Sequence, residues 1–287
     1  MSARPSGGSA VSARLEELLA LMERLRAPDG CPWDREQTFA SIAPYTVEEA
    51  YEVADAIERG DMAHLQDELG DLLFQVVFHS QMGRERGAFD FESVMASICD
   101  KLVRRHPHVF AGRGSLTAAE QAAVWEEIKA QERRERDPAA ASALDGVPQA
   151  LPALMRAYKL SKRAARVGFD FEHPSQTADK VAEELAEVRA AAGASADATI
   201  GDDGAIGEGA AGPSQEVFEE IGDLLFAAAN LARKLEVDAE AALRAANAKF
   251  ERRFRAMESL AATRGQAFAS LDLAAQEELW LDVKRGE

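Results

Sequence analysis

Cysteine is scarce in this sequence, which has only Cys31 and Cys99 among its 287 residues. Neither belongs to a C-x-x-C pair, so a structural zinc site is not expected. So few cysteines exclude a disulfide framework and favour a reduced, cytoplasmic compartment. No apolar run approaches the ~20 residues that a membrane-spanning helix needs. The first residues are small and polar, so no signal peptide is expected either.

Positive charge is also in short supply. The chain has 33 Lys and Arg residues against 50 Asp and Glu residues, which gives a formal net charge of −17. This balance argues against nucleic acid or an anionic membrane surface as the main partner, and a negatively charged substrate would need metal ions as intermediaries. The sequence contains no G-x-x-x-x-G-K-[ST], and its one match to G-x-G-x-x-G, at residues 207–212, lies in a Gly- and Ala-rich stretch that does not follow a strand. Phosphate groups are therefore not expected to bind in a glycine-rich turn.

The sequence does contain extensive helical patterning. Hydrophobic residues make up 47% of the chain, and almost no stretch alternates as a strand does, so we predict an all-α fold. Two of the expected helices run over residues 91–105 and 118–136. The length suggests about two domains. We predict a disordered N-terminus over residues 1–12, a first helical domain over 13–137, a linker over 138–147, and a second helical domain over 148–287 with a flexible insertion at 190–213.

The strongest motif occurs twice. Glu68-Leu-Gly-Asp71-Leu-Leu-Phe74 returns as Glu220-Ile-Gly-Asp223-Leu-Leu-Phe226, and each copy follows an E-E-x-x-E block. Acids three residues apart share one face of a helix. If the two helices of a repeat pack together, their carboxylates converge, as in the metal sites of helical bundles. The candidate metal ligands are Glu49, Glu52, Glu68 and Asp71 in the first copy, and Glu184, Glu187, Glu220 and Asp223 in the second.

Basic and aromatic residues recur after the acids in the same order. Each copy has a Lys and an Arg four residues apart, followed by a Trp and a Lys four residues apart. A repeat kept for packing alone would preserve its apolar spacing and would not need these polar types. The candidate substrate-binding residues are Lys101, Arg105, Trp125 and Lys129 in the first copy, and Lys249, Arg253, Trp280 and Lys284 in the second.

This set of residue types suits cleavage of a polyphosphate. Carboxylates hold Mg²⁺, a hard ion that prefers oxygen ligands, and two such ions ~3.5–4 Å apart bind phosphates and activate water. Lys and Arg neutralise the remaining phosphate oxygens. A tryptophan such as Trp280 would line or stack on a base. Our mechanistic hypothesis is in-line attack of water on a phosphorus atom of the polyphosphate, with Glu183 as a candidate to orient or deprotonate the water.

These blocks resemble the MazG nucleoside triphosphate pyrophosphohydrolases in their two-copy form. The resemblance implies an all-α, Mg²⁺-dependent enzyme, usually a homodimer, that converts a nucleoside triphosphate and water to the monophosphate and diphosphate. It extends over nearly all of the chain, and the insertion at residues 190–213 departs from it. Supporting stretches are Gly30-Cys-Pro-Trp-Asp34, Gln37-Thr-Phe39, Ala43-Pro-Tyr-Thr46, Arg104-Arg-His-Pro-His-Val-Phe110 and residues 249–255.

The resemblance also assigns roles by position. It implies that the second copy carries most of the catalysis. Lys249, Arg253, Trp280 and Lys284 would then contact the substrate. The implied metal ligands are Glu184, Glu187, Glu220 and Asp223, which with Glu183 form the expected catalytic set.

Each feature also has a purely structural interpretation. A single E-x-x-E on a helix is more often a solvent-exposed face. Thr46-x-x-Glu49 fits a capping box in a helix that begins at about Thr46, which would make Glu49 structural. The Lys/Arg pairs alone would more often be surface salt bridges, and Trp125 and Trp280 core anchors. For the whole chain, the alternative is a helical module that binds metal–nucleotide or another protein without hydrolysis.

Overall fold

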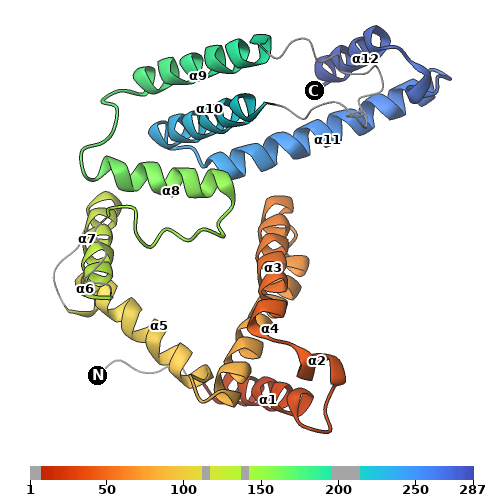
Figure 1. Cartoon of the computed structure of the whole chain (residues 1–287). Helices are drawn as coiled ribbons and strands as arrows, with labels where there is room; N and C mark the ends of the chain where they lie inside the picture. The colour runs from red at the N-terminus through yellow and green to blue at the C-terminus, as the bar shows by residue number, and fades with distance from the viewer. Residues whose placement is uncertain (1–7, 112–116, 137–141, 195–213) are drawn as a thin grey trace. The chain divides into compact units, whose positions relative to one another are not determined.

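The computed structural model describes residues 8–111, 117–136, 142–194 and 214–287 (Figure 1). Their regular structure is helical and includes no strand, which confirms the predicted all-α fold. No helix in these ranges is long and apolar enough to cross a membrane. The chain divides into two compact units, Met1–Ala130 and Gln131–Glu287.

The first unit is built around a helical hairpin of α3 and α4. Gly60 ends α3 with φ at 68°, a left-handed conformation that suits glycine, and the Asp61 side chain accepts from the first backbone N–H groups of α4. The helices of this unit are α1 (Gly8–Arg26), α2 (Pro32–Glu36), α3 (Phe39–Arg59), α4 (Met62–Glu85), α5 (Phe91–Arg105), α6 (Pro107–Phe110) and most of α7 (Ala118–Arg136).

The hydrophobic core of this unit joins α1, α3 and α4. Its members, all at most 2% exposed, are Met22, Ile42, Val77, Phe78 and Met82. Leucines of α1 and aromatic rings from the neighbouring helices pack around them. The repeated acidic motif, residues 68–74, precedes the core residues of α4, so packing fixes the helix that carries the acids.

Two features of this unit differ from the sequence expectations. Helix α1 begins at Gly8, so residues 8–12, which we predicted to be disordered, are helical, in keeping with the helix-forming residues that follow. Helix α3 begins at Phe39, with Thr38 and Ser41 forming a reciprocal capping box. Thr46 lies inside that helix and donates to the Ile42 carbonyl. The capping interpretation of Glu49 is therefore wrong.

A Gly30→Ala substitution is expected to destabilise the first unit by about 2–3 kcal/mol. The Cβ of alanine would overlap the backbone carbonyl oxygens of Arg24 and Leu25, which cannot move aside as a flexible side chain can. Thermal unfolding of the purified variant measures the effect. Gly193→Ala is the control, because its Cβ would meet open space on α9. An unchanged melting temperature for Gly30→Ala would contradict this account of the turn.

The second unit places α9 against α10, and α11 against α12. Met257, Ala261 and Leu279 form the buried core between α11 and α12. Residues 190–194, predicted as part of a flexible insertion, continue α9 because they are mostly alanine, the strongest helix former. Residues 195–213 of that prediction lie outside the described ranges. The helices are α8 (Ala153–Ala165), α9 (Pro174–Ala194), α10 (Gln215–Lys234), α11 (Ala239–Thr263) and α12 (Leu273–Arg285).

Candidate functional site

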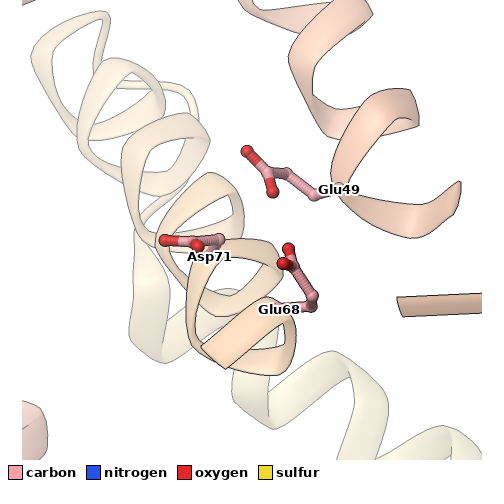
Figure 2. Close-up of side chains that lie close together, drawn as sticks. All are labelled: Glu49, Glu68 and Asp71. Carbon is pink, nitrogen blue, oxygen red and sulfur yellow. The ribbon is translucent and has the colours of Figure 1, made fainter. Parts of the chain in front are cut away.

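The acids of the first repeat converge from α3 and α4. Glu49 extends from α3 toward Glu68 and Asp71 of α4 (Figure 2). One carboxylate oxygen from each of these residues lies within 4.8 Å of the other two. Glu68 is buried, Glu49 is half-buried and Asp71 is exposed, so the group is at the edge of the packed hairpin. Oxygen atoms so placed can share one cation.

The charge of this first group is poorly compensated within the protein. Burial raises the pKa of Glu49, and the neighbouring Asp71 and Glu52 carboxylates raise it further. Burial and the Glu52 carboxylate raise the pKa of Glu68 in the same way. Glu52 thus belongs to the same electrostatic cluster although it is outside the closest group of three. His64 approaches Glu68 at 3.2 Å and partly offsets this effect.

The second repeat builds the same arrangement from α9 and α10. Glu184 of α9 is buried and lies with Glu220 and Asp223 of α10, one oxygen from each within 4.8 Å of the others. Glu187, one turn along α9, contacts Glu184, and this contact raises the pKa of Glu187, to which the Glu220 charge adds. The structure therefore brings the four predicted second-copy ligands into one cluster.

Lys180 distinguishes the second cluster from the first. Its ammonium lies 2.8 Å from Glu184 and 2.9 Å from Glu183, and its hydrogen bond lowers the pKa of Glu184. The sequence reasoning did not single out Lys180. Its spacing of three and four residues before two acids of the same helix was the available signal. Glu183, the candidate base, is exposed and pairs with Lys180, outside the group of three.

The second-copy basic and aromatic candidates lie on α11 and α12. The Arg253 guanidinium is 2.6 Å from the Glu287 carboxylate and 5.4 Å from the centre of the Trp280 ring. Trp280 is half-buried and also contacts Phe250, so it packs in the α11–α12 cluster. Lys249 and Lys284 are exposed. Arg253 and Trp280 thus meet each other, and Glu287 rather than an acid of α9 or α10 pairs with Arg253.

The first-copy candidates are arranged similarly on α5 and α7. The Trp125 indole N–H donates to the backbone carbonyl of Arg105 at 2.8 Å, and its ring meets His106 edge-on. Lys101 is half-buried on α5. Lys129 is half-buried on α7, one turn beyond Trp125. In each unit a tryptophan of a later helix therefore contacts the helix that carries the Lys/Arg pair.

Several known proteins are similar to this chain in sequence. The profile of the MazG nucleotide pyrophosphohydrolase domain matches residues 37–110. A nucleoside triphosphate pyrophosphohydrolase of Escherichia coli K12 is 51% identical over 275 residues, which cover 96% of this chain and 98% of that protein. The nucleoside triphosphate pyrophosphohydrolase/pyrophosphatase MazG of Thermotoga maritima is 40% identical over 272 residues, covering 95% and 96%. The crystal structure of a mazG-related protein from Thermotoga maritima aligns over 40% of this chain and 98% of its own at 27% identity and a TM-score of 0.35.

Proposed function

Because this chain belongs to the MazG nucleotide pyrophosphohydrolase family, we propose that it hydrolyses nucleoside triphosphates to the monophosphate and diphosphate. We assign the reaction to the second repeat, and we propose that the enzyme serves in nucleotide-pool housekeeping. The observation that carries the function is the group of Glu184, Glu220 and Asp223, whose oxygens lie within 4.8 Å of one another on two facing helices. The first repeat has a matching group, so the choice of the second repeat follows the family resemblance.

The donor atoms of this group fit Mg²⁺. All are carboxylate oxygens, the ligands that a hard divalent cation prefers, and no thiolate or imidazole is among them. Glu184, Glu220 and Asp223 would hold the ion, with Glu187 beside them, and we propose that a second ion shares these acids. When bound, Mg²⁺ neutralises phosphate charge and makes water more acidic.

Other residues of the chain would neutralise the phosphate charge and accept the proton of the attacking water. Water attacks the α-phosphorus, the bond from that phosphorus to the bridging oxygen breaks, and diphosphate leaves. Lys249 and Arg253 would neutralise the phosphate oxygens, and Trp280 holds the Arg253 guanidinium in place. Glu183 stays our candidate to accept the proton of the attacking water, and its exposed carboxylate would then exchange its ion pair with Lys180 for the water. A substrate phosphate that binds the Arg253 guanidinium would have to displace the Glu287 carboxylate from it.

Product identification tests this function. The full chain is incubated with the four common ribonucleoside triphosphates and their deoxy forms, with Mg²⁺ and with a chelator. We expect equal amounts of monophosphate and diphosphate in the presence of Mg²⁺ and none with the chelator. Release of orthophosphate with no diphosphate would indicate a different phosphohydrolase. Nucleotide binding without any product would favour a regulatory module.

We also propose that the chain forms a homodimer through an apolar stripe on each acidic helix. Leu69 and Leu73 are exposed on α4, and Ile221 and Leu225 occupy the equivalent positions on α10, also exposed. Large apolar side chains repeated at equivalent exposed positions are typical of a helix face that a partner covers. Gly70 and Gly222 lie beside these stripes, and apart from their chain neighbours and the backbone of their own helix no described atom is within 4 Å of where their Cβ atoms would be. The space there allows a partner helix to approach closely.

Combining Leu73→Arg with Leu225→Arg is expected to convert the dimer into a monomer, halving the molar mass measured by light scattering. A charge placed in the centre of an apolar interface is strongly unfavourable. Leu273→Arg on α12 is the matched control, since Leu273 is exposed outside the stripes. If the double variant keeps the parent mass, the stripes do not form the interface.

We infer for the first repeat a role in binding nucleotide or in holding the dimer. Its acids have the same spacing and the same proximity as those of the second repeat. The absence of a lysine like Lys180 is the clearest difference, because Tyr45 occupies the equivalent position four residues before Glu49. The small number of cysteines supports a cytoplasmic setting for both repeats.

A further inference from the structure

A cavity of about 440 Å³ lies between α8, the turn that follows it and α10 in the second unit. Its lining is mainly apolar and includes three aromatic rings, Phe169, Phe171 and Phe226. Two uncharged polar side chains, Ser161 and Asn230, also line it. Phe169 is 83% exposed. A ring so exposed beside a cavity of this size is suited to cover a bound ligand.

The first unit fills the equivalent place with apolar side chains. Phe78 and Asn230 each lie seven residues after the aspartate of the repeated acidic motif. Phe78 is 1% exposed and belongs to the core. Trp33-Asp34 in the first unit matches Phe169-Asp170 in the second, and Leu25 and Ser161 each lie nine residues before the aspartate of their pair. Leu25 packs against the same core as Phe78. The second unit thus has smaller polar side chains at two positions that the first unit uses for packing.

The polar groups of the cavity have specific hydrogen-bonding capacity. Asn230 Oδ1 accepts from Arg233 Nε at 3.0 Å, and no described residue accepts from its amide nitrogen, which can therefore donate to a ligand. The Ser161 hydroxyl donates to the Tyr158 carbonyl at 3.1 Å, so its oxygen can still accept. The charged groups at the rim are already paired with one another, Asp170 with both Arg233 and Lys234. The cavity therefore suits an uncharged ligand with both donors and acceptors.

The cavity lies on the helix that carries the acids. Phe226 and Asn230 are three and seven residues after Asp223 on α10, and these spacings keep all three on neighbouring parts of one helical face. Seven residues correspond to about 10 Å along the helix axis. A ligand whose phosphates meet Asp223 would therefore extend along α10 and place its other end in the cavity.

We propose that this cavity binds the nucleobase of the nucleoside triphosphate, an inference that rests on the function proposed above. A nucleobase is flat, uncharged and edged with donors and acceptors. It would stack against the aromatic rings and hydrogen-bond to Asn230 and Ser161. Trp280, which we expected to stack on a base, instead packs in the α11–α12 cluster beside Arg253. Asn230 and Ser161 then determine which bases are preferred.

Filling the cavity tests the proposal. Asn230→Phe combined with Ser161→Leu gives the second unit the side-chain character of the first. We expect the affinity for all four nucleoside monophosphates, measured by titration calorimetry with Mg²⁺, to fall at least about tenfold. The affinity for inorganic tripolyphosphate, which has no base, should stay unchanged. Phe169→Ala, which alters an exposed ring and hence cannot unfold the core, should weaken monophosphate binding by about tenfold as well.

Base preference provides the second measurement. Asn230→Leu should change the ratios of kcat/KM among the four nucleoside triphosphates by about tenfold, mainly through KM, because a buried hydrogen bond to the base is lost. Asn247→Leu, the same change at an exposed position of α11, should leave these ratios unchanged. Unchanged monophosphate affinities in the filled and Phe169→Ala variants, or an equal loss of tripolyphosphate binding, would overturn the proposal. Absence of turnover in the parent chain, with base-dependent binding retained, would refute the proposed function and leave the cavity assignment standing.

Discussion

An Asp223→Asn variant is expected to hydrolyse nucleoside triphosphates about a hundred- to a thousandfold more slowly than the parent chain. The amide has the shape of the carboxylate but lacks its charge, so the group formed with Glu184 and Glu220 loses one anionic ligand for Mg²⁺. Steady-state rates of diphosphate release measure the loss. Circular dichroism should show the parent helical content, because Asp223 is exposed and belongs to no core cluster.

The matched control is Asp71→Asn, the same substitution at the same place in the first repeat. If the second repeat carries the catalysis, this control retains most of the activity although its own group of acids is equally compact. Equal losses in the two variants would assign catalysis to both repeats. Full activity in Asp223→Asn would remove the second cluster from the mechanism. Glu187→Ala gives an independent check from α9, with loss of turnover expected.

Removal of divalent metal is expected to abolish hydrolysis and to lower the melting temperature. Bound metal stabilises the folded chain by RT ln(1 + [L]/Kd), which is about 2.7 kcal/mol when the free metal is a hundredfold above Kd. For a protein of this length that corresponds to a shift of several degrees. Thermal unfolding of chelator-treated protein, before and after Mg²⁺ is added back, measures it. An unchanged melting temperature together with full activity would exclude the proposed metal site.

The pH dependence identifies the acids involved. The pKa of Glu68 is raised in the folded chain above the ordinary 4.5, so near neutral pH its charge destabilises the metal-free fold. This destabilisation begins to shrink as the pH falls through the raised pKa, and it is lost below 4.5, where the carboxyl is protonated in the folded and unfolded chains alike. Metal-free Glu68→Gln should therefore melt above the parent at pH 7, by a margin that shrinks toward pH 4.5.

Mg²⁺ should reverse the order of these two proteins, because the ion needs the charged carboxylate. Comparing variant with parent at each pH removes the effect of other titrating groups. His79 is one of these, since burial lowers its pKa and its protonation destabilises the fold at acidic pH. If Glu68→Gln melts below the parent in the absence of metal, the repulsion within the first cluster is not significant.

The sequence predicts the acid clusters well because their spacing is a property of single helices. Acids three residues apart must share a face, and duplication shows which acids belong together. The expected helices over residues 91–105 and 118–136 have the bounds of α5 and α7 for the same reason, since periodicity and capping are local. Pairing of α3 with α4 then follows from the short turn at Gly60.

Other features depend on contacts that a linear pattern does not contain. The start of α3 was misplaced because Pro44 interrupts the helical pattern, although the fold tolerates it near the N-terminal end of the helix. Lys180 and Glu184 are on one helix, so their pairing is open to prediction from the sequence. Its importance for the site is not, because it depends on Glu220 of α10 lying beside Glu184. The cavity beside Asn230 exists because the second unit has no large side chain at the position that Phe78 occupies in the first unit.

Lys180 and Tyr45, at matching positions of the two repeats, show how little has to change for duplicated sites to diverge. The ammonium of Lys180 gives one cluster an internal counter-ion, whereas His64 offsets the repulsion in the other only in part. Both keep the same ligands on the same kind of hairpin. One exchanged side chain is therefore enough to give two duplicated copies a different balance of charge, without any rearrangement of the helices that carry the acids.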